Sequence, residues 1–482
     1  MSAAKGLAVV ALLCLLYAYG LFRDPAKWEE PRRALISIEM ITSGDYVVPR
    51  LLGEPYLNKP PLFNWLGAAI SGYRIDRVGP PAFRIVSLSA LVVVCLLLWR
   101  LGISGAWPRP DPLPGLLFAT MGIVVQYGRA GEIDMLLCAL TTSALACFEF
   151  GRRRRSVVLQ WIVPQIFVGL GVLTKLVAPL VFYPAVLVTA WRRRRDCPFS
   201  PTAFIAGLAL MSAIVGAWLF FYSQRQPLGP LVARWGYEAA HRFRNADPGD
   251  GLSTVLIHVL VYPFVVVGKT LPWSLWLSVF LWREPRRRLA EALRDPFLYL
   301  AAAVSVTVFL GPAFAVEGRG RYLMPALPFV SLGAAWVVRD GRFLDKAQPE
   351  AWATRSNRRS LLGRPHAFAW TLGAALLYAT IYVATTERAR ARTGYRYRAQ
   401  ARELAALIDA SEPVVVDGAV TYRLVLPLYR RLGEMPRARR PAKSAYEWVG
   451  VADSPPPAGA EPLGEAGSFR AWSVPGRPAD SP

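Results

Sequence analysis

Residues 29–61 of this chain read EEPRRALISIEMITSGDYVVPRLLGEPYLNKPP and stand between two strongly apolar stretches. Apolar residues recur at helical spacing over 31–43, which predicts a short amphipathic helix. Residues 62–72 are also apolar, but they are too few to cross a bilayer, because a crossing takes about 20 residues. The sequence therefore predicts two short helices that lie along a membrane surface.

The composition places the chain in a membrane. Of its 482 residues, 54% are hydrophobic and 12% are aromatic, which is too apolar for a soluble protein of this length. A net charge of +23 would favour nucleic acid as the partner of a soluble protein. Here the arginines fall in short runs between apolar stretches, as in cytoplasmic loops. We therefore expect a lipid bilayer as a partner and no nucleic acid.

Cysteine and histidine are too sparse to indicate a metal site. The five cysteines lie mostly inside apolar segments, without the spacing of metal ligands or of a disulfide framework. Only three histidines are present. We expect no metal and no cofactor.

Eleven apolar stretches are long enough to be spanning helices at about 1.5 Å per residue. They cover 6–22, 83–100, 113–128, 134–151, 157–173, 176–191, 202–222, 253–282, 296–312, 321–338 and 367–385. Because 253–282 contains Pro263 and Pro272, we interpret it as one kinked helix. Residues 6–22 also have features of a signal peptide, but we expect a retained helix that tethers the outer loop.

Arginine runs set the orientation. They lie at 152–155, 192–195, 286–288 and around 355–359, and the positive-inside rule places them in the cytoplasm. With the N-terminus inside and one crossing per stretch, all four runs fall on the inner side. The outer side then receives 23–82, 129–133, 174–175, 223–252, 313–320 and the tail from 386.

Acidic side chains gather on the predicted outer side. Asp24, Glu29 and Glu30 closely follow the first apolar stretch. Glu132 and Asp134 stand at the start of the fourth. Acids at such positions either cap helices toward water or face a cavity in which they act on a substrate. Because all five map to one face, we favour a reaction centre, with helix caps as the alternative.

The run from Glu29 to Pro61 resembles the first outer loop of GT-C membrane glycosyltransferases of the aminoarabinose-transferase and protein-mannosyltransferase type. In that loop an acidic pair followed by Arg opens a helix, Ser-Gly-Asp and a Val-Pro turn follow, and a segment ending in Lys-Pro-Pro closes it. Here the order is EEPRR, SGDYVVPR and NKPP. Similar pieces are GRAGEIDM (128–135), GLGVLTK (169–175), LPWS (271–274) and RGRYLMPALP (319–328). The resemblance covers the membrane portion and weakens after 386.

The resemblance implies a fold and a reaction. The fold is an α-helical, polytopic, GT-C-like membrane domain with about eleven or more spanning helices, and the reaction uses a polyprenyl-phosphate-linked sugar donor. The first acid of the pair, Glu29, then serves as base or acceptor orienter, although the family usually has Asp there. Glu30, Asp24 and Asp134 are further candidates for this catalytic role.

A leaving polyprenyl phosphate needs fixed cations at the membrane surface. The resemblance implies Lys59 of NKPP as the first of these, and Asn58 stands where many relatives carry Glu, which removes a possible metal ligand. The other candidates for the donor phosphate are Arg32, Arg33, Arg244, Lys175 and Arg321. Candidates for substrate contacts are Glu132, Tyr322 and Tyr56. The alternative for the basic residues is contact with lipid headgroups.

The tail from 386 has a different composition. A basic, helix-like stretch (388–410) precedes PVVVDG as a strand, TYRLVLPLYRRLG as a helix, and YEWVGV and SFRAWSV as further strands. This pattern predicts a small α/β domain. We therefore divide the chain into a membrane domain, 1–385, and an extracytoplasmic α/β domain, 386–482.

Together these features predict a monomeric glycosyltransferase of the bacterial inner membrane, with its active site and C-terminus on the periplasmic side. The donor is a polyprenyl (undecaprenyl) phosphate sugar, and lipid A-like glycolipid, protein and cell-envelope glycan remain possible acceptors. The main alternative is a flippase or transporter of a lipid-linked saccharide, which would place charges near mid-membrane. A non-catalytic envelope scaffold is the third possibility.

Overall fold

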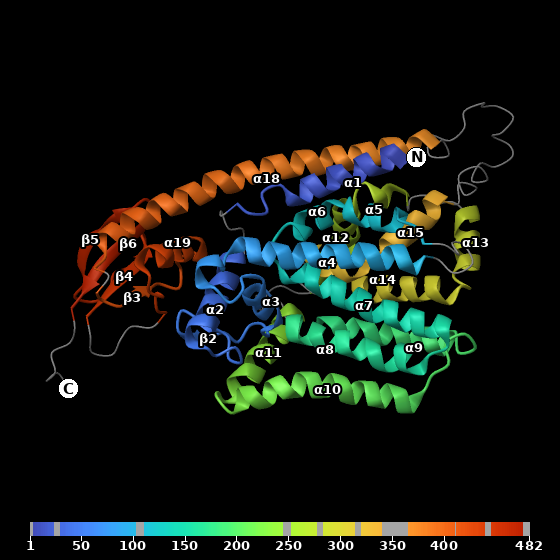
Figure 1. The fold of residues 1–482 in the computed structure, drawn as a ribbon, viewed down its shortest axis with the longest axis horizontal. Coiled ribbons are helices and arrows are strands. Elements are labelled where there is room, and N and C mark those ends of the chain that lie inside the picture. Colours follow the sequence, from blue (N-terminus) through green and yellow to red (C-terminus); the bar gives the residue numbers. More distant parts are fainter. Residues whose placement is uncertain are drawn as a thin grey trace.

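The computed structural model describes residues 3–23, 29–102, 110–243, 252–276, 283–313, 320–339, 365–409, 411–438 and 445–475. Most of them form a bundle of helices that run side by side, with a small sheet domain at one end (Figure 1). The apolar elements of the bundle are α1 (Ala3–Ala18), α4 (Pro80–Leu101), α5 (Leu113–Ala119), α6 (Gly122–Gly128), α7 (Ile133–Arg154), η2 (Val158–Ile162), α8 (Val163–Lys175), η3 (Ala178–Val181), α9 (Phe182–Arg192), α10 (Pro201–Ser223), α12 (Leu252–Thr270), α14 (Pro296–Ala313), η5 (Gly320–Ala326), α15 (Leu327–Arg339) and α18 (Pro365–Leu407).

Six of the described helices are long and apolar enough to cross a membrane. They are Pro80–Leu101, Ile133–Arg154, Val158–Lys175, Pro201–Ser223, Gly320–Val338 and Phe368–Leu407. Each coincides with a predicted stretch, which confirms the helical membrane architecture. The remaining five predicted stretches coincide with the shorter elements α1, α5 with α6, η3 with α9, α12 and α14, so eleven crossings stay a prediction.

The stretch 113–128 divides into two helices, α5 and α6, where one was predicted. The Trp273 indole donates to the Thr120 hydroxyl at the break (2.9 Å). The Tyr17 hydroxyl donates to the Ala119 carbonyl at the end of α5 (2.8 Å). Backbone groups freed at membrane depth need such partners from neighbouring segments. At this break the Tyr17 hydroxyl satisfies the Ala119 carbonyl, and Trp273 holds the Thr120 side chain.

The prediction of one kinked helix over 253–282 is wrong. Helix α12 contains Pro263 but ends at Thr270, before Pro272. Proline lacks the N–H that would continue the helical hydrogen bonds, so Pro272 cannot extend α12, whereas Pro263 is accommodated inside it. Residues 277–282 lie outside the described residues.

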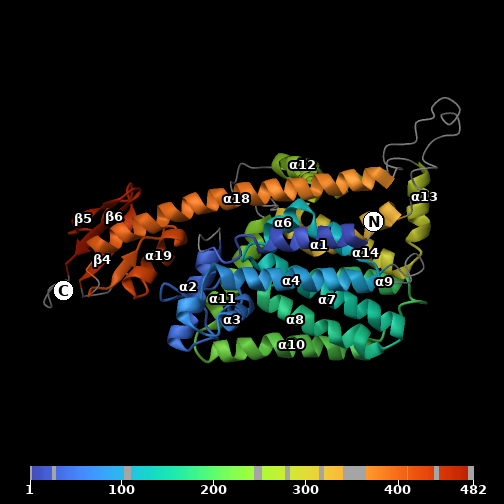
Figure 2. The ribbon, with the colours of Figure 1, turned by 45° about the horizontal axis from the view of Figure 1, so that its top comes forward.

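The arginine runs that the structure describes lie together at the end of the bundle away from the sheet domain. Arg153 donates to the Gly102 carbonyl after α4 (3.3 Å). Arg193, after α9, donates to the Leu293 carbonyl after α13 (Arg283–Ala292). Figure 2 shows α13 at the end opposite the sheet, as Figure 1 does. Three of the four predicted inner runs therefore share one end, and the fourth, around 355–359, lies outside the described residues.

The outer loop folds into α2 (Glu30–Ser43) and α3 (Leu62–Ile70), as predicted, with a short ladder of β1 (Arg50–Leu51) and β2 (Glu54–Pro55) between them. Pro31 stands in the first turn of α2, where a missing N–H breaks no helical bond. Gly44 ends this helix with φ of +70°, a left-handed cap that glycine adopts without strain. The loop continues through η1 (Ile75–Arg77) into α4.

Glu30 and Arg84 form a buried ion pair that joins the outer loop to the bundle. Arg84 on α4 donates to both carboxylate oxygens of Glu30 (2.9 and 2.7 Å), and neither side chain is more than 1% exposed. Glu30 also accepts the Gly131 N–H before α7 (2.9 Å), and Arg84 donates to the Arg23 carbonyl after α1 (2.5 Å). Burial alone would raise the pKa of Glu30, but Arg84 outweighs it and holds the pKa below its ordinary value.

The tail forms a four-stranded sheet whose spatial order is β3 (Val414–Val416), β4 (Tyr446–Val451), β6 (Phe469–Val474) and β5 (Glu461–Ala466). The β3–β4 pair is parallel and the others are antiparallel. Helix α19 (Tyr422–Leu432) and strands β3, β4 and β6 coincide with predicted elements. Strand β5 was not predicted, because EPLGEA has low strand propensity and forms a sheet edge with a bulge.

Helix α18 carries this domain. It runs unbroken over 43 residues, about 64 Å at 1.5 Å per residue, from the bundle to the sheet (Figure 1). The predicted division at 385/386 therefore falls inside one helix. Leu424 and Val425 of α19 share a buried apolar cluster with Leu35 and Ile38 of α2. The C-terminal domain thus packs directly on the outer loop.

The ion pair gives the first prediction. Glu30→Gln should lower the free energy of unfolding by about 3–5 kcal/mol, because it leaves a buried guanidinium without its carboxylate. The measurement is thermal unfolding of the detergent-solubilised protein. Asp76→Asn is the control, since Asp76 forms an exposed pair with Arg74 (64% and 57% exposed), and such pairs contribute about 0–1 kcal/mol. A Glu30→Gln variant as stable as Asp76→Asn would contradict the structural role of the pair.

Candidate active site

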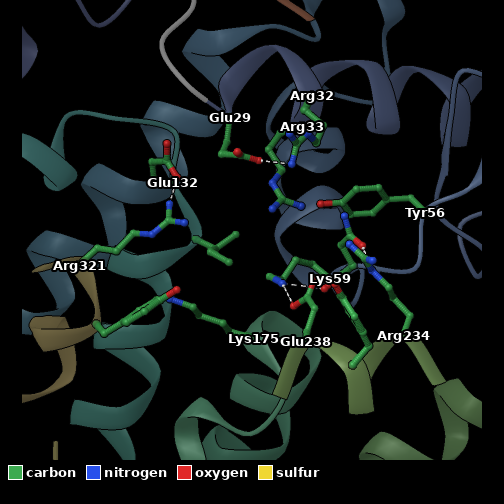
Figure 3. A pocket seen from close by; sticks show the side chains of 14 residues that line it. Glu29, Arg32, Arg33, Tyr56, Lys59, Glu132, Lys175, Arg234, Glu238 and Arg321 are labelled. Atoms are coloured by element: carbon green, nitrogen blue, oxygen red, sulfur yellow. Dashed lines mark hydrogen bonds and ion pairs between the residues drawn. The ribbon is translucent and has the colours of Figure 1, made fainter. Parts of the chain in front are cut away.

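A cavity of about 420 Å³ lies between the outer loop and the ends of several bundle helices (Figure 3). Its lining residues are Glu29, Arg32, Arg33, Tyr56, Asn58, Lys59, Glu132, Ile133, Lys175, Arg234, Tyr237, Glu238, Arg321 and Tyr322. Six of them are cations and three are carboxylic acids. The outer loop, α8, η5 and α11 (Leu228–Phe243) supply the cations, so segments far apart in the sequence converge on one cationic space.

Lys59 lies on the loop wall of the cavity, opposite α11. Its Nζ is 2.6 Å from Oε2 of Glu238, and both side chains are less than one-fifth exposed. Arg234, one turn earlier on α11, donates to the Asn58 side-chain oxygen (2.7 Å). Arg244 was the cation predicted from this part of the chain, and it lies outside the described residues. The i, i+4 spacing of Arg234 and Glu238 on a helix was the signal that could have found them.

Lys175 ends α8 and turns toward the cavity, where it lies 4.7 Å from the centre of the Tyr322 ring. Its ammonium forms an ion pair with Asp134 on α7. Asp134 is 1% exposed and lies behind Lys175, outside the cavity lining. The geometry therefore gives Asp134 the task of holding Lys175, and it does not support the predicted catalytic role.

Glu132 and Arg321 face each other on another wall, with 3.7 Å between Oε2 and Nη1. Glu132 is 2% exposed, and its Oε1 has no hydrogen-bond partner among the described residues. Burial, and next the charge of Asp134, raise the pKa of Glu132 to about 8, although Arg321 opposes the shift. Burial thus favours the neutral form of this carboxyl, which can donate a hydrogen bond into the cavity.

The two adjacent acids of the outer loop point in different directions. Glu29 lines the cavity, where its Oε2 is 2.7 Å from Nη1 of Arg32. Glu30 points to Arg84, since neighbouring residues on a helix are about 100° apart. The structure thus brings Glu29 and not Glu30 to the cavity, and Asp24 lies outside the described residues.

Arg33 is the most unusual cation of the cavity. It projects from α2 into the cavity (Figure 3), with its guanidinium 5.7 Å from the centre of the Tyr56 ring. It is only 3% exposed, and its Nε and Nη1 have no hydrogen-bond partner among the described residues. A buried charge without an opposite charge is unfavourable unless a ligand completes it. The cavity is therefore suited to bind an anion beside Arg33.

Metal-ligating side chains do not gather in threes anywhere in the described part of the chain. Four of the cavity's cations, Arg32, Lys59, Lys175 and Arg321, instead lie beside carboxyl groups. The expectation of a site without metal or other cofactor stays a prediction.

The fold is that of the GT-C membrane glycosyltransferases. Over 98% of both chains it matches the crystal structure of ArnT from Cupriavidus metallidurans bound to undecaprenyl phosphate, with a TM-score of 0.68 at 17% identity. A second match is the apo oligosaccharyltransferase of Archaeoglobus fulgidus, with a TM-score of 0.50 at 13% identity over 90% of this chain and 64% of that chain.

Sequence comparisons agree with the fold. Residues 58–220 match the family model described as dolichyl-phosphate-mannose-protein mannosyltransferase. Similar curated proteins include the undecaprenyl phosphate-alpha-4-amino-4-deoxy-L-arabinose arabinosyl transferases of Pseudomonas aeruginosa (27% identity over 65% of this chain) and Edwardsiella ictaluri (28% over 69%). The chain spans 57% and 60% of the length of these two relatives. The resemblance inferred from the outer loop is thus confirmed.

The unpaired nitrogens of Arg33 give a prediction with two parts. Arg33→Met should weaken binding of undecaprenyl phosphate by about 10- to 100-fold, since hydrogen bonds to charged groups contribute about 1.5–3 kcal/mol. The same variant should be at least as stable as wild type without ligand, because it removes an unpaired buried charge. Thermal unfolding with and without undecaprenyl phosphate measures both, with exposed Arg77→Met as control. Unchanged binding, or a large loss of ligand-free stability, would contradict this interpretation.

The pKa of Glu132 gives a pH prediction. A carboxyl whose pKa is higher in the folded state stabilises the fold fully below its ordinary pKa of 4.5 and loses that contribution as pH rises through about 8. Glu132→Gln keeps the neutral form at every pH. The difference in unfolding temperature between Glu132→Gln and wild type should therefore grow from pH 5 to pH 8. A difference that stays constant over this range would show that Glu132 is ionised in the folded protein.

Proposed function

We propose that this protein transfers a sugar from a polyprenyl-phosphate-linked donor to an acceptor at the extracytoplasmic face of a bacterial inner membrane. The observation that carries the proposal is the cavity itself, in which the Glu29 carboxylate and the cations Arg33 and Lys59 line one space. The GT-C fold and the arabinosyl transferases among the relatives support the same reaction class.

In the proposed reaction an acceptor hydroxyl attacks the anomeric carbon of the donor sugar. The bond from that carbon to the phosphate oxygen breaks, and its electron pair leaves with the polyprenyl phosphate. Glu29 accepts the proton of the attacking hydroxyl. Where the acceptor is itself a phosphate, no proton is lost and Glu29 only positions it.

Arg33 and Lys59 stabilise the leaving phosphate, whose negative charge grows as the bond breaks. Glu238 holds the Lys59 ammonium in the cavity, and in the proposed reaction the phosphate replaces Glu238 as its partner. Lys175 and Arg321, on the other walls, contribute to the same positive potential. The remaining candidates for sugar or acceptor contacts are Glu132, Tyr322 and Tyr56, all of which line the cavity.

The orientation and the division of the chain are part of the proposal. The arginine-rich end of the bundle faces the cytoplasm by the positive-inside rule, which puts the cavity and the C-terminal domain on the periplasmic side. We keep a membrane domain, 1–385, and a C-terminal α/β domain, 386–482, and we expect a monomer. A lipid A-like glycolipid, a protein or an envelope glycan fits as acceptor. The comparisons give no support to a flippase.

Glu29→Gln is the test of the proposed chemistry. Transfer from a panel of polyprenyl-phosphate sugars should fall about 10²- to 10⁴-fold, the usual contribution of a general base, while binding of undecaprenyl phosphate is retained. Asp76→Asn, in the same loop but exposed, should transfer at the wild-type rate. Full activity of Glu29→Gln would remove Glu29 from the mechanism, and an inactive wild-type protein on every donor would contradict the proposed function.

A further inference from the structure

The C-terminal domain contacts the candidate site through one aromatic ring. Tyr422 is the first residue of α19, and the centre of its ring lies 5.0 Å from the guanidinium carbon of Arg32. Arg32 lines the cavity, whereas Tyr422 stands behind it and outside the lining. Tyr422, nearly 400 positions away in the sequence, therefore packs against Arg32 from outside the cavity.

Arg32 links this ring to the proposed base. Its Nη1 is 2.7 Å from Oε2 of Glu29, and its side chain also hydrogen-bonds Tyr56. Burial alone would lower the pKa of Arg32, but Tyr56, Glu29 and Tyr422 together raise it above its ordinary value. The guanidinium is thus held on one side by the Tyr422 ring and on the other by the Glu29 carboxylate.

The position of Tyr422 is itself fixed by contacts between the C-terminal domain and the outer loop. The Ala438 N–H donates to the Leu52 carbonyl (3.0 Å), and the Arg430 side chain donates to the Val78 carbonyl (3.3 Å). Buried Leu424, half a turn beyond Tyr422, belongs to the apolar cluster that α19 shares with α2. These contacts set the ring in place before any ligand arrives.

We propose that the C-terminal domain completes the active site and that Tyr422 is a positioning residue for Glu29, acting through Arg32. The inference rests on the proposed function, in which Glu29 is the base or orienter. An arginine over an aromatic ring gains a directional attraction. Without the ring, the Arg32 guanidinium moves away from Glu29 more often. The Glu29 carboxylate then spends less time in its reactive orientation.

The test compares Tyr422→Leu with Tyr422→Phe. Tyr422→Leu should lower kcat about 3- to 30-fold, the equivalent of a cation–π contact, with little change in donor KM, because Arg33 and Lys59 are untouched. Tyr422→Phe keeps the ring and should recover most of the rate. Tyr395→Leu is the matched control, since Tyr395 also lies against an arginine, Arg398 (5.4 Å), but on the exposed face of α18, and it should transfer like wild type.

A double-mutant cycle with Arg32→Met distinguishes positioning from general damage. If Tyr422 acts through Arg32, Tyr422→Leu should have almost no further effect in the Arg32→Met background. Effects that add, or a Tyr422→Phe variant as slow as Tyr422→Leu, would overturn the proposal.

A readout independent of turnover separates this inference from the proposed function. Hydrogen exchange of the Arg33 amide, which donates to the Glu29 carbonyl at the start of α2 (3.0 Å), should be faster in Tyr422→Leu than in Tyr422→Phe or wild type, since Arg32 then holds Glu29 less firmly while the Glu30–Arg84 pair still anchors the rest of the helix. Equal exchange in all three proteins would overturn the inference even in an active enzyme. If exchange is faster in Tyr422→Leu but the wild-type protein transfers no sugar, the result supports the contact between Tyr422 and Arg32 and contradicts only the proposed function.

Discussion

The buried ion pair between Arg84 and Glu30 is the constraint on which the site depends. Two charges out of water are tolerated only when they are paired and hydrogen-bonded, and here the Gly131 N–H and the carbonyl of Arg23 complete the pair. The pair therefore fixes the start of α2 against α4 and against the segments beside α1 and α7. With that turn fixed, Glu29 and its neighbours on α2 are directed into the cavity.

The cavity repeats this principle for most of its buried cations, and Arg33 is the buried cation that departs from it. Lys59 is paired with Glu238, and Lys175 with Asp134, so the cations are held in place without a ligand. Arg33 lacks an acidic partner among the described residues, and this gives the site its attraction for an anion. Positive groups fixed in advance stabilise a developing negative charge without reorganisation. The same arrangement suits a lipid phosphate at a membrane surface.

The sequence predicted most helices of the fold because hydropathy and arginine runs are local properties of the chain and need no knowledge of distant contacts. They placed Glu29, Lys59, Lys175 and Arg321 on one face, where the structure brings them to one cavity. Hydropathy and charge alone could not choose between the adjacent acids Glu29 and Glu30, a choice that came from the family resemblance, since the direction of a side chain depends on a distant partner such as Arg84.

Contacts between side chains on different helices could not be predicted from these local patterns either. The contact of Asp134 with Lys175 joins two helices, so Asp134 was expected in the cavity itself. Arg244 was selected from the predicted outer segment 223–252, whereas the contact of Arg234 with Asn58 joins α11 to the outer loop and had no local signal beyond the helical spacing of Arg234 and Glu238. A structure of the protein with bound undecaprenyl phosphate tests the central claim most directly. The account predicts the phosphate within hydrogen-bond distance of Arg33 and Lys59, in place of Glu238. A phosphate bound elsewhere, with the cavity unchanged, would contradict it.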